Sequence, residues 1–301
     1  MKRRIPIIIG LIVVLTFALA ACGGGKGAQG GGSPAGSATA SLGGSSGGSA
    51  KLAAAVEAAI DTMYFDGSMK ELANKDFGDD FTAGLRDVKE QPTIPKDFTT
   101  IKQGTLMVGL ECGYPPMEYF DTDGTTMVGF DIDVANKLGE LLGLKVEFVD
   151  TAWDGIFAGL DKGLYDCIIS SVSITPERQQ NYILTEPYVS NRLCLVTYAG
   201  NGGTGAGVKS PDDFPGHTIA VQVATTAADS VDKMIKDGAK NIEVGRYEKV
   251  TQCFDELKLG RVDAVYVDSV VASYYTKDNA EYQRVWMNDV GEPMGICFAR
   301  K

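Results

Sequence analysis

The chain has 301 residues, 44% of them hydrophobic, and carries 39 acidic against 28 basic side chains, a formal net charge of −11. This length and apolar content suffice for a full core divided between two lobes. The acidic balance argues against nucleic acid as a partner, because a phosphate backbone would be repelled. The single histidine, His217, and the lack of CxxC spacing give neither a zinc site nor a histidine-based triad. We therefore expect no metal, no cofactor and no catalytic residue.

The first 22 residues have the pattern of an export signal. Three basic residues at 2–4 precede an apolar run at 5–19, which is short for a transmembrane helix. The ending Leu19-Ala20-Ala21-Cys22 resembles the bacterial lipobox, which implies removal of residues 1–21 and lipidation of Cys22. A plain signal peptide or an uncleaved membrane anchor is the alternative. Residues 22–51, rich in Gly and Ser, are then expected to form the lipidated cysteine and a flexible linker.

Residues 52–85 predict two helices. Apolar side chains recur on one face of the first helix, at Leu52, Val56, Ile60 and Met63. Gly67 ends this helix, and Ser68 with Glu71 is expected to form a capping box that opens a second, short helix. Residues 86–103, with two prolines, have the composition of a connector.

The rest of the chain alternates strands and helices, which is typical of an α/β fold with parallel strands covered on both faces. We expect the strands at 106–110, 146–149, 167–170, 218–222 and 264–267. The intervening helices are expected near 133–142, 154–160, 176–180, 226–236 and 250–259. An odd number of cysteines follows Cys22, so they cannot all pair. Four lie within apolar patterns and are interpreted as packing residues: Cys167, Cys194, Cys253 and Cys297.

Polar and aromatic side chains follow these strands. Ligands of parallel sheets bind beyond the carboxyl ends of the strands, so the side chains found there are candidates for one cleft. They are Glu111, Tyr114, Trp153, Ser170, Ser171, Ser173, Thr225, Thr226 and Asp268. For the two aromatic residues, ordinary core packing is the alternative interpretation.

Arg178 stands out because of the residues before it. In Thr175-Pro176-Glu177-Arg178, Thr175 has the features of a helix N-cap and Pro176 those of the first helical position. A guanidinium beside the free N–H groups of a helix start can bind a carboxylate in a bidentate manner. A solvated surface arginine is the alternative.

Five ordered motifs resemble those of the family 3 solute-binding proteins, from about residue 104 to 301. They are Gly109-Leu110-Glu111 with Tyr114-Pro115-Pro116, Gly129-Phe130-Asp131-Ile132-Asp133, Trp153-Asp154-Gly155, Ser173-Ile174-Thr175-Pro176-Glu177-Arg178 and Gly260-Arg261-Val262-Asp263-Ala264. The family comprises polar amino acid receptors of ABC importers. The resemblance implies a two-lobed periplasmic-binding-protein-like fold of type II, with a mostly parallel sheet in each lobe, helices on both faces and two hinge crossings.

The resemblance also implies roles for the candidate residues. Arg178 would hold the ligand's α-carboxylate, helped by Ser173 and by the helix that Thr225 and Thr226 open, expected to be capped by a Thr226 to Asp229 box. Asp268 would bind the α-ammonium group. The remaining contacts would come from Ser171, from Glu111 at a distal polar group, and from Tyr114 and Trp153 around the ligand side chain. Ala224-Thr225-Thr226 stands where the family usually has Gly-Thr-Thr, which alters the backbone near the carboxylate.

One departure from the family concerns the order of segments. Members continue beyond the equivalent of residues 295–301 into two helices, and those motifs occur here at the front, as Ala55-Val56-Glu57-Ala58-Ala59-Ile60 and Asp66-Gly67-Ser68. We therefore expect a circular permutation in which residues 52–85 are the family's closing helices; a truncated chain with an unrelated stalk is the alternative. Lobe 1 would comprise 52–188 plus 294–301 and lobe 2 would comprise 193–289, with crossings at 187–193 and 290–295.

The expected function is that of a monomeric, extracytoplasmic receptor, lipid-anchored to the cell membrane through Cys22. It would close by hinge motion on a polar amino acid and deliver it to an ABC permease and its ATPase. Glu111 between two aromatic rings favours a cationic amino acid, whereas the combination of motifs also resembles cystine-binding members. A ligand-sensing module for a signalling partner and a dehydratase-like enzyme on the same fold are the alternatives.

Overall fold

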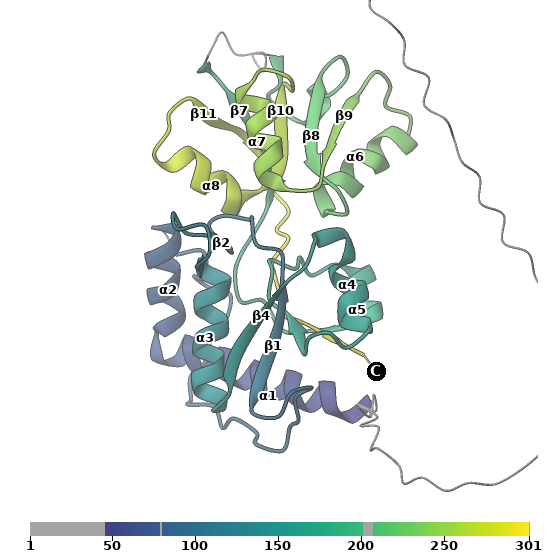
Figure 1. Cartoon of the computed structure of the whole chain (residues 1–301). Coiled ribbons are helices and arrows are strands. Elements are labelled where there is room, and N and C mark those ends of the chain that lie inside the picture. The colour runs from purple at the N-terminus through teal and green to yellow at the C-terminus, as the bar shows by residue number, and fades with distance from the viewer. Residues whose placement is uncertain (1–45, 79, 201–206, 301) are drawn as a thin grey trace, which may run out of the picture. The chain divides into compact units, whose positions relative to one another are not determined.

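The computed structural model describes residues 46–78, 80–200 and 207–300 (Figure 1). The predicted export signal, Cys22 and most of the predicted linker lie outside these residues. In the described part of the chain, no helix is both long enough and apolar enough to cross a membrane. The predicted character of Cys167, Cys194, Cys253 and Cys297 is confirmed, because each is buried and free, as is Cys112.

The two N-terminal helices are α1 (Ser46–Asp66) and α2 (Ser68–Phe77). The predicted apolar face of α1 is confirmed, since Leu52 and Met63 are buried. The helix begins at Ser46, however, so the expectation of a flexible linker up to residue 51 is wrong there: packing extends a helix into a Gly-rich segment of low propensity. The predicted capping box is also wrong. Gly67 is the N-cap, in the left-handed conformation with φ 82°, and Ser68 is already helical.

Lobe 1 contains a five-stranded sheet in the order β4-β1-β5-β12-β6. Its strands are β1 (Thr105–Leu110), β4 (Lys145–Asp150), β5 (Cys167–Ile168), β6 (Tyr182–Leu184) and β12 (Cys297–Ala299). β1 runs parallel to β4 and β5, whereas β12 runs antiparallel to β5 and β6. A short antiparallel pair, β2 (Tyr119–Phe120) and β3 (Met127–Val128), follows β1.

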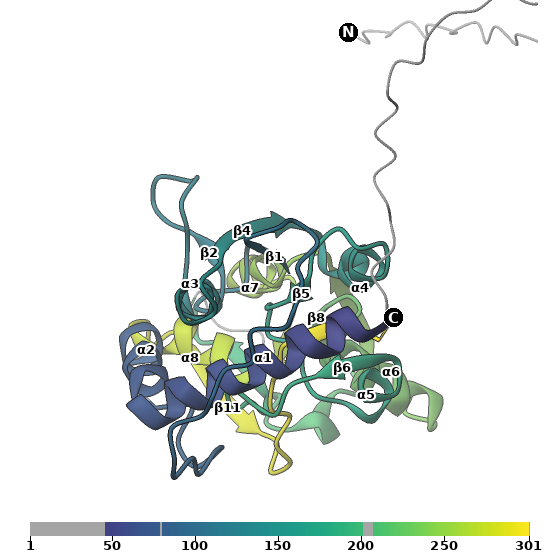
Figure 2. The ribbon, with the colours of Figure 1, turned by 90° about the horizontal axis from the view of Figure 1, so that it is seen from below.

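Helices cover both faces of this sheet, as predicted (Figures 1 and 2). α1, α2 and α3 (Phe130–Leu142) share a core with Val108 and Phe298 of the sheet. On the other face, α4 (Trp153–Asp161) packs on Ile168 and Cys297, and α5 (Pro176–Asn181) leads into β6. The N-terminal helix α1 therefore packs beside the last described strand, β12.

Lobe 2 repeats this design with a sheet in the order β11-β7-β10-β8-β9. The strands are β7 (Leu193–Tyr198), β8 (Thr218–Gln222), β9 (Glu243–Tyr247), β10 (Ala264–Asp268) and β11 (Tyr282–Met287). α6 (Thr226–Lys236) packs on one face, while α7 (Val250–Lys258) and α8 (Ser269–Lys277) pack on the other; a 3-10 turn, η3 (Pro211–Asp213), precedes β8.

Most strands of each sheet run in the same direction, as predicted. β8, β9 and β10 are parallel, but β7 is antiparallel to both β10 and β11. In each lobe, four strands run in one direction and one runs the other way, β12 in lobe 1 and β7 in lobe 2. Each reversed strand is the first one after a crossing, because a chain arriving from the other lobe enters the sheet from the opposite end.

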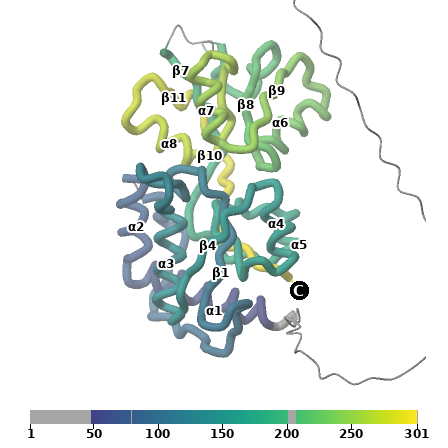
Figure 3. Tube along the Cα trace, viewed as in Figure 1, coloured from purple at the N-terminus to yellow at the C-terminus, as the bar shows by residue number. Residues whose placement is uncertain are grey.

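Two extended crossings join the lobes, at 185–192 and 288–296, which confirms the predicted pair of hinges (Figure 3). They lie side by side: the Met294 N–H donates to the Val189 carbonyl at 3.0 Å, and the Tyr188 N–H donates to the Met294 carbonyl at 3.0 Å. The lobes are thus connected by a narrow hydrogen-bonded ribbon about which they can rotate.

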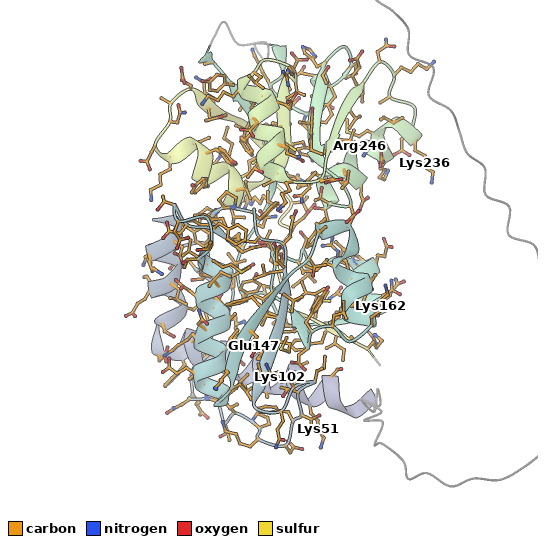
Figure 4. The ribbon with its side chains drawn as sticks, viewed as in Figure 1. Lys51, Lys102, Glu147, Lys162, Lys236 and Arg246 are labelled. Atoms are coloured by element: carbon orange, nitrogen blue, oxygen red, sulfur yellow. The ribbon has the colours of Figure 1, made fainter. Side chains whose placement is uncertain are left out.

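Charged side chains gather on the outside of the lobes (Figure 4). Lys102 and Glu147 point toward one another on lobe 1, with 2.7 Å between Nζ and Oε2, and both are exposed. Such exposed pairs contribute little to stability. The informative charges are instead the buried ones between the lobes.

Candidate ligand-binding site

A small cavity lies between the lobes. Its lining is formed by Glu111, Tyr114, Glu118, Trp153, Ser170, Ser171, Ser173, Arg178, Gln222, Thr225, Thr226 and Asp268. All nine predicted ligand-binding residues are in this set. The carboxyl ends of β1 and β5 in lobe 1 face those of β8 and β10 in lobe 2, which brings these side chains together.

Arg178 reaches the cavity from the first turn of α5. Thr175 caps this helix as predicted, because its side-chain oxygen accepts from the Arg178 N–H at 3.2 Å, and Pro176 is the first helical residue. The guanidinium lies 5.5 Å from the Trp153 ring centre and 5.2 Å from that of Phe157, and Nη1 donates to the Ser173 carbonyl at 3.0 Å. Burial lowers its pKa.

Asp268 ends β10 on the opposite lobe and is only 8% exposed. Its Oδ2 accepts from the Tyr114 hydroxyl at 2.5 Å, and its Oδ1 accepts from the Asn191 amide at 2.6 Å. Burial raises its pKa, while these two donors and the Arg178 charge oppose that rise. Asn191, on the first crossing, therefore holds Asp268 in position.

The half-buried Arg178 and the buried Asp268 lack ionic partners in the described part of the chain. Within the described residues, neither Arg178 nor Asp268 has an opposite charge within the 4.0 Å that defines an ion pair. A desolvated guanidinium and a desolvated carboxylate are both costly unless compensated. The cavity thus has one positive and one negative end, each able to accept a complementary charge.

The aromatic walls also connect the lobes. Tyr114 and Trp153 are each 8% exposed, and Trp153 donates from Nε1 to the Ala224 carbonyl at 2.8 Å. Both residues therefore combine the two interpretations that the sequence left open: their rings are largely buried, and the same rings line the cavity.

Two serines present lobe 1 backbone to the cavity. Ser171 has a left-handed conformation, φ 52°, and its N–H donates to Asp131 Oδ2 at 2.8 Å. A non-glycine residue in this region is strained, so Asp131 fixes an otherwise unfavourable turn. Ser173 supplies its carbonyl to Arg178 and pairs with Met294 of the second crossing, which couples the site to the hinge.

The start of α6 differs from the prediction. The N-cap is Thr225, whose Oγ1 accepts from the Ala228 N–H at 3.2 Å, so the expected Thr226 to Asp229 box is wrong. Thr226 lies one residue inside the helix, and its side chain bonds to Glu292. The cause is Ala224, which adopts φ 57° and places Thr225 at the cap. Alanine in this conformation is strained where glycine would not be.

Glu111 forms the floor of the cavity at the end of β1. Its Oε2 accepts from the Gln222 amide at 2.7 Å, and its Oε1 is buried without a hydrogen-bond partner. Burial raises the pKa of Glu111 to about 7, although Gln222 and the Lys249 charge oppose the rise. The free oxygen is an acceptor available to a ligand.

Glu118 and Gln222 line the cavity but were not predicted. Glu118 lies in the turn before β2, where no strand pattern points to it. Gln222 is the last residue of a strand that was predicted with the correct bounds. Inspecting the final residue of each strand, and not only those that follow it, would have found Gln222.

Four hydrogen bonds cross between the lobes around the cavity. Besides the Tyr114–Asp268, Trp153–Ala224 and Gln222–Glu111 bonds, Lys249 donates from Nζ to the Cys112 carbonyl at 3.0 Å. The lobes are therefore closed on each other in this structure. In the described part of the chain, no cluster of residues has the composition of a metal site.

Residues 106–283 match the family of bacterial extracellular solute-binding proteins, family 3. The chain belongs to this family. The L-cystine-binding protein TcyJ of Escherichia coli K12 is 32% identical over 200 residues, which span 66% of this chain and 69% of that protein.

Solved structures of the family agree with this assignment. An ancestral arginine-binding protein bound to arginine is 37% identical with a TM-score of 0.60, over 65% of this chain and 85% of that one. The arginine-bound, truncated ArgBP of T. maritima is 34% identical with a TM-score of 0.59, over 65% and 88% of the two chains. The predicted type II periplasmic-binding-protein fold is confirmed.

Proposed function

We propose that this family 3 protein is the amino acid receptor of an ABC importer, acting outside the cytoplasm. The observation that supports this proposal most directly is the pair of charges without ionic partners in the described chain, the half-buried Arg178 on lobe 1 and the buried Asp268 on lobe 2, that line one cavity. A free amino acid has an α-carboxylate for the first and an α-ammonium group for the second. A ligand with only one charged group could not neutralise both Arg178 and Asp268.

The side-chain contacts extend this proposal. Ser171, Ser173, Thr225 and Thr226 supply polar groups near the carboxylate end, while Tyr114 and Trp153 enclose the ligand side chain. Glu111 then meets the distal group with its unpaired oxygen. The relatives include both cystine-binding and arginine-binding proteins. The acidic floor and the aromatic walls favour a cationic amino acid over cystine.

Transport follows from the position of the ligand between the lobes. Because the ligand contacts both lobes, it stabilises the closed form over the open form, and an ABC permease can distinguish the two. In this proposal Cys22 carries a lipid anchor that keeps the receptor at the outer face of the membrane, near the permease and its ATPase. The protein binds and releases its ligand unchanged, and acts as a monomer.

A thermal-shift panel tests the proposal. The twenty amino acids, cystine and ornithine are each added to the protein, and the true ligand raises the melting temperature in proportion to the logarithm of its concentration. Asp268→Asn should abolish the shift, whereas Asp289→Asn, at an exposed position, should retain it. A panel with no shift at all would count against an amino acid receptor.

A further inference from the structure

A pair of carboxyl groups lies behind the cavity, buried from solvent. Glu118 is 1% exposed and Asp131 is 0% exposed, and they bond to adjacent residues, Glu118 to the Ser170 hydroxyl and Asp131 to the Ser171 N–H. In the described part of the chain, no lysine, arginine or histidine forms an ion pair or hydrogen bond with either group. Two ionised carboxylates cannot be stable so close together without a cation, so the pair must hold a proton.

The hydrogen bonds locate this proton on Glu118. Both oxygens of Asp131 accept from donors: Oδ1 from the Tyr188 hydroxyl at 2.6 Å and Oδ2 from the Ser171 N–H. Glu118 accepts only at Oε1, from the Ser170 hydroxyl at 2.5 Å, and its Oε2 has no donor. A proton on Oε2 donated to Asp131 satisfies every atom of the pair. In agreement, burial and the Asp131 charge raise the pKa of Glu118 well above its ordinary value.

Glu118 also lines the cavity, beside Glu111. We infer, on the basis of the proposed function, that binding of an amino acid with a cationic side chain expels the proton shared by Glu118 and Asp131 into solvent. The O–H bond of Glu118 breaks, the proton passes to the buffer, and the ligand cation replaces it as the positive charge beside the carboxylates. A neutral ligand supplies no such charge, and the proton stays.

The surrounding charges favour this exchange. Acidic groups dominate around the pair: Glu111 at the cavity floor, Asp268 on lobe 2, and Asp76 and Asp133 beyond Asp131. The neighbouring cations are Arg178, which faces the opposite end of the proposed ligand, Lys249 near Glu111, and Lys75, which is bonded to Asp133. None of them contacts Glu118, so a ligand cation is the first positive charge to reach it.

Titration calorimetry in two buffers with different heats of protonation measures the proton count directly. The full chain is titrated with L-arginine and with L-glutamine at pH 8, where Glu111, with a pKa of about 7, is already mostly ionised. We expect about one proton released per arginine and none with glutamine. For the same reason, arginine affinity should rise up to about tenfold per pH unit around pH 8.

Glu118→Gln separates this inference from a general effect of pH. The carboxamide has the same shape, can donate to Asp131 and cannot release a proton, so the arginine that binds to this variant, at whatever affinity, should bind without proton release. Glu177→Gln, at an exposed position on α5, should release the proton as the wild type does. Proton release that persists in Glu118→Gln, or arginine binding without release in the wild type, overturns the inference.

Infrared spectroscopy tests the ligand-free protein independently of any binding. The wild type should show a carbonyl band of a buried, protonated carboxyl group at pH 8, and Glu118→Gln should lack it. If the band is absent, the inference is wrong even when amino acids bind. If the band is present and the entire amino acid panel fails to bind, the proposed function is wrong, and so is the exchange that rests on it. A panel in which only neutral ligands bind likewise overturns the exchange.

Discussion

Arg178 contacts two aromatic rings and a carbonyl but no carboxylate among the described residues. Replacing it by Met would keep most of the packing and remove the charge. We expect Arg178→Met to lower ligand affinity roughly a hundredfold or more, because a charge-assisted, bidentate contact is lost in a buried site. Titration calorimetry measures this effect. Arg246→Met, which breaks an exposed pair with Asp232, should leave the affinity unchanged.

The raised pKa of Glu111, about 7 against an ordinary 4.5, predicts a pH dependence of stability. Between these values the folded ligand-free protein binds more protons than the unfolded chain, so its stability falls as pH rises. Above pH 7 Glu111 is ionised in the folded protein, and its ionisation lowers the free energy of unfolding by an amount on the order of 3 kcal/mol. Glu111→Gln should therefore be more stable than the wild type at pH 8 and nearly equal to it at pH 4.

Denaturant unfolding at the two pH values checks this prediction. Glu90→Gln, on the exposed connector, serves as the control and should show no such trend. A stability gain in Glu111→Gln that is as large at pH 4 as at pH 8 would contradict a cost of ionisation.

At the scale of residues, the sequence predicted most of the cavity lining. Trp153 and Asp268 were found because both lie at the carboxyl ends of strands, where the fold places ligands. Glu118 was not, because it belongs to an irregular turn and reaches the cavity only through tertiary structure. The strained Ala224 was noted as unusual, but only the structure shows that it sets the cap of α6.

Among the elements, α1 is tied to the first crossing through one buried arginine. Arg86, whose side chain is 6% exposed, pairs with Glu57 and Asp61 of α1 and donates from Nε to the Pro187 carbonyl at 2.8 Å. Burial raises the pKa of Glu57, and Arg86 opposes that rise. This cluster fixes the start of the hinge to the helical layer.

Arg86→Met should therefore destabilise the protein by about 3–5 kcal/mol, since it leaves two acidic groups and two carbonyls without their donor. The midpoint of denaturant unfolding measures the change. Arg261→Met removes a more exposed arginine paired with Glu256 and should cost no more than about 1 kcal/mol. Equal effects of the two substitutions would show that the Arg86 cluster has no special role.

Elements with a clear period were predicted well, and short or irregular ones were not. β8 and α6 have the predicted bounds, because each combines an apolar pattern with a recognisable end. β6 and β12, of three residues each, carry too little pattern to predict. β7 is buried along its whole length, so it shows no alternation that would distinguish it from a buried helix segment.

For the whole molecule, closure depends on bonds between the lobes as well as on the ligand. Lys249 of lobe 2 bonds to the Cys112 carbonyl of lobe 1 at the edge of the cavity. Lys249→Ala should shift the ligand-free protein toward the open form, seen as a larger radius of gyration in small-angle scattering. Saturating ligand should restore the compact form. Lys236→Ala, at an exposed position on α6, should change neither measurement.

The circular permutation is a second proposal at this scale. Both views place the start of α1 near the end of the described chain (Figures 1 and 2). A rearranged protein that begins at residue 104, runs to 301 and continues through a short Gly-Ser linker into 46–103 should then fold and bind the same ligand. Circular dichroism and the thermal-shift panel check both properties.

The matched control is residues 104–301 alone. It lacks α1 and α2, and so exposes the surface against which Met63 and Phe77 are buried. We expect this fragment to be unstable or to aggregate. A stable fragment, or a rearranged protein that fails to fold, contradicts the proposal. The sequence motifs pointed to this order of segments, which requires the N-terminal helices to pack beside the last strand, and α1 does pack beside β12.

The packing of α1 against β12 has a consequence for how the protein matures. The first helix of the described residues has a partner strand more than two hundred residues later in the chain. Until that strand is available, the part of α1 that packs on β12 stays uncovered, although α2 and α3 can already pack on the rest of the helix. The core of lobe 1 therefore cannot be completed before β12 has been synthesised.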